Sequence, residues 1–273
     1  MWKGFNVEIE EAFFKEKITG TSLSLWDKFI ASAKEFRARC QRDIQTKIVS
    51  EKWVLDGVGI ESNWFPKLSN HVFISHSHAD EQLALALAGA LKEWLKIDSF
   101  VDSAIWGHFE ELQTSLFKKI AQGRSLEAIE EFKLWNTVSS HVHCMLSKSL
   151  IQMIDQCECL IFLNTPSSIQ VNEIVGRTST YSPWIYTEIE VSRFLRKMPD
   201  PRRPNEELLK ESFAQDAAIE CRVEYPLNLD HLLSKTGVDI WNWICSGYKA
   251  LNNDASLAEG QEAFCALDAL YAQ

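Results

Sequence analysis

The residue types best suited to chemistry lie where a helix is expected to begin at Ser182. Ser182 is a good N-cap residue and Pro183 suits the first helical turn, so the start of this helix is well specified. Trp184 and Glu188 are then four residues apart and share one helix face. A large aromatic surface beside a carboxylate suits a pocket that stabilises developing positive charge. A core Trp184 beside a solvated Glu188 is the purely structural alternative.

A second polar group, residues 75–80, follows a short apolar run that is expected to form a buried strand. The hydroxyls of Ser75 and Ser77, with His76 and the backbone N–H groups, can hold a polar or anionic ligand at such a strand end. An ordinary capping loop, with Asp80 as the N-cap of the next helix, explains the same residues equally well.

The next expected strand, residues 99–103, contains Asp102 and leads into a loop with Trp106 and Gly107. With Gly107 beside it, Trp106 can cover a flat ligand ring by stacking, and a buried Trp106 fits the sequence equally well. Asp102 is a candidate for the same pocket, with bracing of the sheet as its structural alternative. The sequence leaves both alternatives open.

Short apolar strands alternate with amphipathic helices through the middle of the chain. Strands are expected at residues 72–74, 99–103 and 159–163, and a further one at 218–225. Helices are expected from Asp80 through an apolar stripe to Trp94, over much of the region up to 156, at 183–197 and at 230–248. This alternation predicts an α/β fold with a doubly wound parallel sheet. Ligands bind such sheets at the carboxyl ends of the strands, so three strand-end loops are expected around one crevice.

The first 50 residues lack this alternation and are expected to be helical. Ser24 can cap an amphipathic run over residues 25–36 whose apolar side chains recur at helical spacing. The structural interpretation is a helical extension packed on the main domain, and the functional alternative is a helix that binds a partner.

Composition excludes several classes of protein. The 273 residues, 46% of them hydrophobic, suffice for one sizeable core with an extension. A formal charge of −10 argues against a protein that coats nucleic acid. The seven cysteines are scattered and odd in number, which is typical of reduced thiols in a cytoplasmic protein. We expect neither a signal peptide nor a membrane-spanning segment.

Three segments together resemble the TIR (Toll/interleukin-1 receptor) domain family. Residues 71–80 resemble its opening strand and loop, residues 100–103 its second strand before the BB loop, and residues 182–189 its S-x-W-x-x-x-E-I helix start. The resemblance covers roughly residues 70–250 and implies a flavodoxin-like three-layer fold. Residues 1–69 are then an N-terminal helical extension, residues 104–157 a helical insertion after the second strand, and residues 251–273 a C-terminal helical tail.

Among TIR proteins, the chain is most similar to bacterial stand-alone members, including those of Thoeris-type antiphage defence. The resemblance implies an NADase with Glu188 as the catalytic residue, NAD as substrate, and neither a metal nor a further cofactor. The product is then a linear or cyclic ADP-ribose-type signal in bacterial antiviral immunity. Expected partners are further copies of the chain through TIR surfaces and a separate effector protein that senses the product. The residues expected to bind the substrate are Ser75, His76, Ser77, Asp102, Trp106 and Trp184.

The chemistry asked of Glu188 is modest. Cleavage of the nicotinamide–ribose bond passes through an oxocarbenium-like transition state, as glycosidic cleavages do. Nicotinamide leaves from a cationic ring and needs no general acid. One carboxylate near the ribose can therefore hold its hydroxyls and stabilise the developing charge.

Two other functions fit parts of the sequence. TIR domains also act as non-catalytic assembly modules, because one fold can host either role. His76, His78 and Asp80 resemble part of the H-x-H-x-D-H zinc motif of metallo-β-lactamase-like hydrolases, with His141 and His143 downstream. The final histidine of that motif is absent here, and the strands that such a fold needs upstream are not expected.

Overall fold

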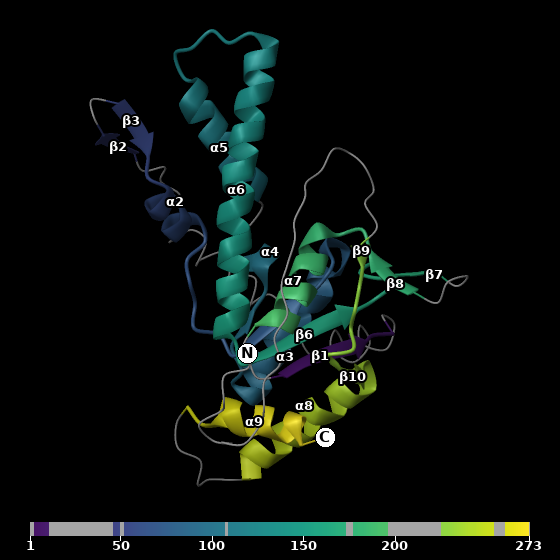
Figure 1. The fold of residues 1–273 in the computed structure, drawn as a ribbon. Helices are drawn as coiled ribbons and strands as arrows, with labels where there is room; N and C mark the ends of the chain where they lie inside the picture. The colour runs from purple at the N-terminus through teal and green to yellow at the C-terminus, as the bar shows by residue number, and fades with distance from the viewer. Residues whose placement is uncertain are drawn as a thin grey trace. The chain divides into compact units, whose positions relative to one another are not determined.

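The computed structural model describes residues 3–10, 46–49, 52–106, 109–172, 177–195, 225–253 and 260–272. It confirms the expected α/β class, with a central parallel sheet of five strands flanked by helices (Figure 1). The strand order is β10-β1-β6-β4-β5, and every neighbouring pair is parallel. The strands are β1 (Lys3–Glu8), β4 (Val72–Ser75), β5 (Ser99–Phe100), β6 (Cys159–Asn164) and β10 (Leu233–Thr236).

The described residues divide into two compact units. The first contains the five-stranded sheet, the 3-10 turn η1 (His78–Asp80), and helices α3 (Glu81–Leu95), α7 (Pro183–Phe194), α8 (Gly237–Asn253) and α9 (Glu262–Tyr271). It also contains an antiparallel sheet of β7 (Gln170–Asn172), β8 (Arg177–Thr180) and β9 (Tyr225–Pro226). The second unit contains β2 (Thr46–Val49), β3 (Lys52–Leu55), α2 (Gly57–Trp64), α4 (Asp102–Ile105), α5 (Phe109–Ala121) and most of α6 (Ala128–Gln156).

Strand β1 corrects the expectation that the first 69 residues form a helical extension. Its residues lie in the middle of the main sheet, between β6 and β10. Phe5, Val7 and Ile9 are buried and alternate with polar residues, which is the period of a strand rather than of a helix. The helix expected over residues 25–36 lies outside the described residues.

The strand order is that of a flavodoxin-like sheet, except that the fourth position is occupied by a strand from the start of the chain. Counted from β4, the order β5-β4-β6 is the 2-1-3 arrangement of such folds. The fourth place is taken by β1 from the start of the chain, and β10 occupies the last. The topological switch point therefore lies between β4 and β6, where ligands of such sheets bind.

Three further boundaries differ from the sequence-based expectation. Residues 233–236 form β10, so the closing helix begins at Gly237 and not at residue 230. The second strand is short because Asp102 already begins helix α4. The expected strand at 218–225 meets the described residues only at Tyr225, which begins β9.

Helix α3 carries much of the core of the first unit. Its apolar stripe, Leu83, Leu87 and Leu91, is buried, and the helix packs against β4, β5, α8 and α9. Trp243 of α8 is fully buried, and its Nε1 donates to the carbonyl of Ala266 in α9 at 2.7 Å. In the described part of the chain, no helix has the length and apolar character needed to cross a bilayer.

Candidate functional site

Helix α7 begins as the sequence predicts. The Ser182 Oγ accepts a hydrogen bond from the Ile185 backbone N–H at 3.2 Å, and Pro183 occupies the first helical position. This cap satisfies one of the backbone donors left free at a helix start. Ile185 and Ile189 are buried, which fixes the rotation of the helix. Glu188 therefore points inward from the second turn and is only 3% exposed.

Glu188 is held by a hydroxyl from a distant part of the chain. The Ser75 Oγ donates to the Glu188 Oε2 at 2.6 Å, and Ser75 is the last residue of β4 and 1% exposed. A hydrogen bond to a carboxylate is stronger than one between neutral groups, and burial strengthens it further. The structure thus brings together two residues that are 113 positions apart and belong to separate sequence motifs.

The other hydroxyl of the same loop forms a second buried network. The carboxylate Oδ2 of Asp80 accepts hydrogen bonds from the Ser77 Oγ and from the Thr165 Oγ1, the latter at 2.6 Å. Asp80 precedes α3 as expected, but its side chain does not cap the helix. Instead it joins the loop after β4 to the loop after β6. Thr165 was not among the candidates, because its contribution depends on this pairing between strands.

The loop after β6 is closed by its own hydroxyls. The Ser168 Oγ donates to the Leu163 carbonyl at 2.9 Å and accepts from the Thr165 backbone N–H at 2.8 Å. His76 is half-buried, and its Nδ1 lies 3.3 Å from the Ile74 carbonyl oxygen. The carboxyl ends of β4 and β6 therefore present a set of buried polar groups at the switch point of the sheet.

A histidine braces helix α7 one turn beyond Glu188. The Ser192 Oγ donates to the Ile189 carbonyl at 2.7 Å and lies 2.8 Å from the His231 Nε2. Because this hydroxyl donates to the helix backbone, the His231 N–H is its natural donor. Ser192 is thus used in positioning the helix and is not poised as a nucleophile.

Two other predicted residues, Asp102 and Trp106, have contacts within their own part of the chain. Asp102 and Trp106 belong to the second compact unit, where the Asp102 carbonyl accepts from the Trp106 N–H at 2.9 Å. Trp106 is 5% exposed, stands edge-on to Phe65 at 5.4 Å, and donates its Nε1 to the Pro66 carbonyl at 3.3 Å. These contacts correspond to the buried-tryptophan alternative. Gly107 lies outside the described residues.

Two further expectations concern Trp184, which was predicted to bind the substrate, and the alternative of a zinc site at His76, His78 and Asp80. Trp184 is half-buried in the first turn of α7. Across the residues that the structure describes, no three histidine, cysteine, aspartate or glutamate side chains gather in a way that can hold a metal ion. The Nδ1 of His143, one of the downstream histidines, lies 2.7 Å from the Ser139 carbonyl of its own helix.

Two buried thiols near the start of β6 have low reactivity. Burial raises the pKa of the Cys157 thiol to about 12, and it raises the pKa of the Cys159 thiol well above its usual value. Both thiols therefore stay protonated at neutral pH and are poor nucleophiles and poor metal ligands.

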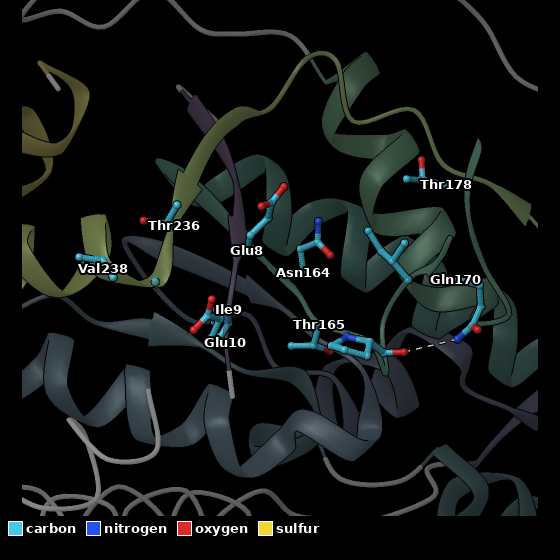
Figure 2. A pocket seen from close by; sticks show the side chains of 12 residues that line it. Glu8, Ile9, Glu10, Asn164, Thr165, Gln170, Thr178, Thr236 and Val238 are labelled. Carbon is cyan, nitrogen blue, oxygen red and sulfur yellow. Dashed lines mark hydrogen bonds between the residues drawn. The ribbon is translucent and has the colours of Figure 1, made fainter. Parts of the chain in front are cut away.

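A cavity of about 760 Å³ opens at the carboxyl ends of β1, β6 and β10 (Figure 2). Its described lining includes Thr165 but neither Ser75 nor Glu188. The sequence contains a signal for this site that the helical interpretation of the N-terminus missed: the alternation of polar and apolar residues from Phe5 to Glu10. The lining residues are Glu8, Ile9, Glu10, Asn164, Thr165, Pro166, Ile169, Gln170, Thr178, Thr236, Gly237 and Val238.

Comparison of the chain with models of protein families, with curated proteins and with solved structures gave no match. The functional interpretation therefore depends on the geometry of the strand ends and on the motifs in the sequence. Of these, the hydrogen bond between Ser75 and Glu188 is the feature that joins two motifs at one site.

Proposed function

We propose that this chain is a TIR-type enzyme that cleaves the nicotinamide–ribose bond of NAD, with Glu188 as the catalytic carboxylate. The observation that carries the proposal is the 2.6 Å hydrogen bond from Ser75 to Glu188. It places a carboxylate at the switch point of a parallel sheet, where ligands of such folds bind. Glutamates are rarely buried in folded proteins. A buried carboxylate with a hydrogen-bond donor of its own is uncommon outside functional or structural networks.

In the proposed reaction, the bond between the pyridine nitrogen and the ribose C1′ breaks, and the electron pair leaves with neutral nicotinamide. The ribose becomes an oxocarbenium ion, which the negative charge of the Glu188 carboxylate stabilises while Ser75 holds its Oε2. Water then adds to C1′ and loses a proton, giving ADP-ribose. Attack by an atom of the adenine in place of water gives a cyclic product, and exclusion of water from the pocket decides between them.

The burial of both residues bears on regulation. Ser75 and Glu188 are 1% and 3% exposed, so a substrate must displace part of their cover before it reaches the carboxylate. We therefore expect low turnover in the resting chain and a rise when a trigger or self-assembly opens the site. This fits a cytoplasmic antiphage protein whose product signals to a separate effector.

The test is release of nicotinamide from NAD, followed by mass spectrometry, in infected and uninfected cells and with purified protein. Glu188→Gln is expected to lower the rate of release by about 10²–10³-fold, because the amide carries no negative charge to stabilise the oxocarbenium ion. Glu190→Gln is the matched control, since Glu190 lies on the same helix and has the same charge but is only half-buried. Full turnover in Glu188→Gln would exclude this carboxylate as the catalytic group.

The assembly-module alternative makes a different prediction. If the chain only assembles, no preparation releases nicotinamide, including extracts of infected cells, and Glu188→Gln changes neither signalling nor self-association. That result would contradict the enzymatic proposal as a whole.

A further inference from the structure

Three strands end in register at the cavity, and their last residues form a polar row. Glu8 of β1 is paired with Asn164 of β6 on one side and with Thr236 of β10 on the other. Residues in register on neighbouring parallel strands point to the same face and lie about 4.8 Å apart. A hydroxyl, a carboxylate and a carboxamide therefore stand side by side at the rim of one cavity (Figure 2).

The side chains of this row differ in whether they form hydrogen bonds within the protein. Thr236 is engaged, because its Oγ1 donates to the Asp239 Oδ2 at 2.7 Å and caps the start of α8. Within the part of the chain that the structure describes, no hydrogen bond reaches the Glu8 carboxylate or the Asn164 carboxamide. Glu8 is exposed and Asn164 half-buried, so both can bind a ligand at little cost in desolvation.

The spacing and chemistry of this pair suit vicinal hydroxyls. A carboxylate accepts two O–H donors, and a carboxamide both accepts and donates, so the pair matches a ribose diol that spans neighbouring positions. A carboxylate at the end of a parallel strand holds ribose hydroxyls in other doubly wound folds. Ile9, Ile169 and Val238 add an apolar wall to the cavity, whose volume lies in the range of small-molecule sites and which can accept a flat base.

Charge decides against a phosphorylated ligand. Glu8 and Glu10 both line the cavity, and its described lining includes no lysine or arginine. The N-terminus of α8 at Gly237 would attract an anion, but Asp239 already places a carboxylate in its first turn. A diphosphate here would meet two carboxylates without a compensating cation.

We propose that this cavity is a binding site for an uncharged ribonucleoside, whose ribose diol is held by Glu8 and Asn164. The site is distinct from the Ser75–Glu188 pair, and the proposal does not depend on NAD cleavage. It assigns a role to the N-terminal strand β1, which brings Glu8 to the middle of the sheet edge.

The experiment is calorimetric titration of the full chain with adenosine and uridine, and with their 2′-deoxy forms. At least one ribonucleoside is expected to bind, and loss of the 2′-hydroxyl is expected to weaken binding about tenfold or more, because the carboxylate then lacks one donor. Adenosine monophosphate is expected to bind more weakly than adenosine. Equal binding of ribo and deoxy forms, or no binding of either ribonucleoside at millimolar concentration, would overturn the proposal.

Variants test the row itself. Glu8→Gln and Asn164→Ala are each expected to weaken ribonucleoside binding about tenfold. Glu10→Gln, which removes the same charge from the same cavity outside the row, is expected to leave the affinity for the ribonucleoside within about twofold. Glu188→Gln is expected to leave this affinity unchanged, so failure here and failure of the NAD proposal are told apart. Unchanged affinity in Glu8→Gln, with an unfolding temperature equal to that of the parent, would also overturn the proposal.

Discussion

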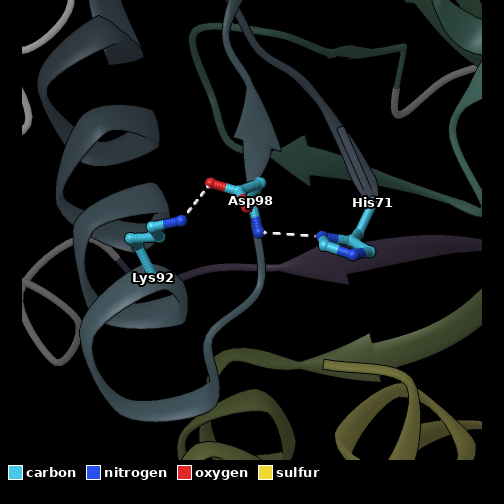
Figure 3. A network of polar contacts seen from close by, with 3 residues as sticks. All are labelled: His71, Lys92 and Asp98. Atoms are coloured by element: carbon cyan, nitrogen blue, oxygen red, sulfur yellow. Dashed lines mark hydrogen bonds and ion pairs between the residues drawn. The ribbon is translucent and has the colours of Figure 1, made fainter. Parts of the chain in front are cut away.

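The amino ends of the parallel strands form one edge of the central sheet, the amino edge, and their carboxyl ends form the other, the carboxyl edge. Both edges contain histidines and carboxylates, but these polar groups have different partners at the two edges. At the amino edge, His71, Asp98 and Glu158 come directly before β4, β5 and β6. The Asp98 N–H donates to the His71 Nδ1 at 3.0 Å, and the Asp98 carboxylate pairs with Lys92 (Figure 3). The His71 and Glu158 N–H groups donate to the carbonyls of Asp98 and His71 at 2.8 and 2.9 Å.

Helix α9 completes the amino edge. The Tyr271 hydroxyl donates to Glu158 at 3.2 Å, the Lys3 ammonium donates to the Tyr271 carbonyl at 3.2 Å, and Phe264 stands edge-on to His71. At the carboxyl edge, Glu188 accepts a hydrogen bond from Ser75, and Glu8 lines a cavity. The polar groups of the amino edge thus hold helix α9 against the sheet, whereas at the carboxyl edge we propose ligand-binding roles for Glu188 and Glu8.

The largest expected effect is on the rate of nicotinamide release, which should fall for a variant at the carboxyl edge and not for one at the amino edge. Glu188→Gln is expected to lower the rate of nicotinamide release by about 10²–10³-fold, the range for loss of one electrostatic contact to a transition state. Tyr271→Phe at the amino edge is expected to leave the rate within about twofold. The measurement is the initial rate of each purified variant, and a comparable loss in both would remove the distinction between the edges.

A large effect on stability is expected at the amino edge. Tyr271 is buried and stacks on Phe5, so Tyr271→Ala is expected to lower the free energy of unfolding by about 3–5 kcal/mol. Tyr271→Phe keeps the ring and removes the hydroxyl that donates to Glu158, and it is expected to cost about 1 kcal/mol. Urea denaturation measures both. Equal losses in the two variants would mean that the hydroxyl, and not ring packing, holds α9.

A smaller effect follows from the titration of His71. Burial lowers the pKa of His71 below its usual value, opposed by Asp98 and Glu158 and aided by Lys92. The folded chain therefore binds fewer protons at this group than the unfolded chain, so its contribution to stability is complete above about pH 6.5 and is lost as pH falls toward the lowered pKa. Protonation would also put a hydrogen on Nδ1, which accepts from Asp98.

The check is the urea midpoint of the parent and of His71→Gln between pH 5 and pH 7. The parent is expected to lose more stability than the variant as the pH falls through this window. Parallel pH profiles would show that other groups dominate the acid sensitivity of the chain.

The smallest effect is expected at the rim of the amino edge. Lys92 and Asp98 pair across a partly exposed surface, so Lys92→Met is expected to change the free energy of unfolding by less than about 1 kcal/mol. Salt should reduce the difference further, because exposed ion pairs are screened. A larger loss that persists in high salt would mean that Lys92 contributes through packing.

Several elements were predictable because their signals are local. The start of α7 is specified by Ser182 and Pro183 within one turn, and the buried strands β4 and β6 by short apolar runs. Strand β1 was equally visible in the alternation of Phe5 to Glu10, but the helical spacing farther along masked it. The side-chain role of Asp80 was not predictable, because capping and bonding to Thr165 compete for the same carboxylate.

The sequence by itself determined the α/β class, the start of α7 and the presence of Glu188 on that helix, since propensity, capping and periodicity act over a few residues. Only the tertiary structure decided that Ser75 meets Glu188 and that β1 lies between β6 and β10. These pairings join residues more than a hundred positions apart, and they depend on which apolar faces bury one another best. That competition is settled by the whole fold, and it placed Glu8 beside Asn164 at the rim of the cavity.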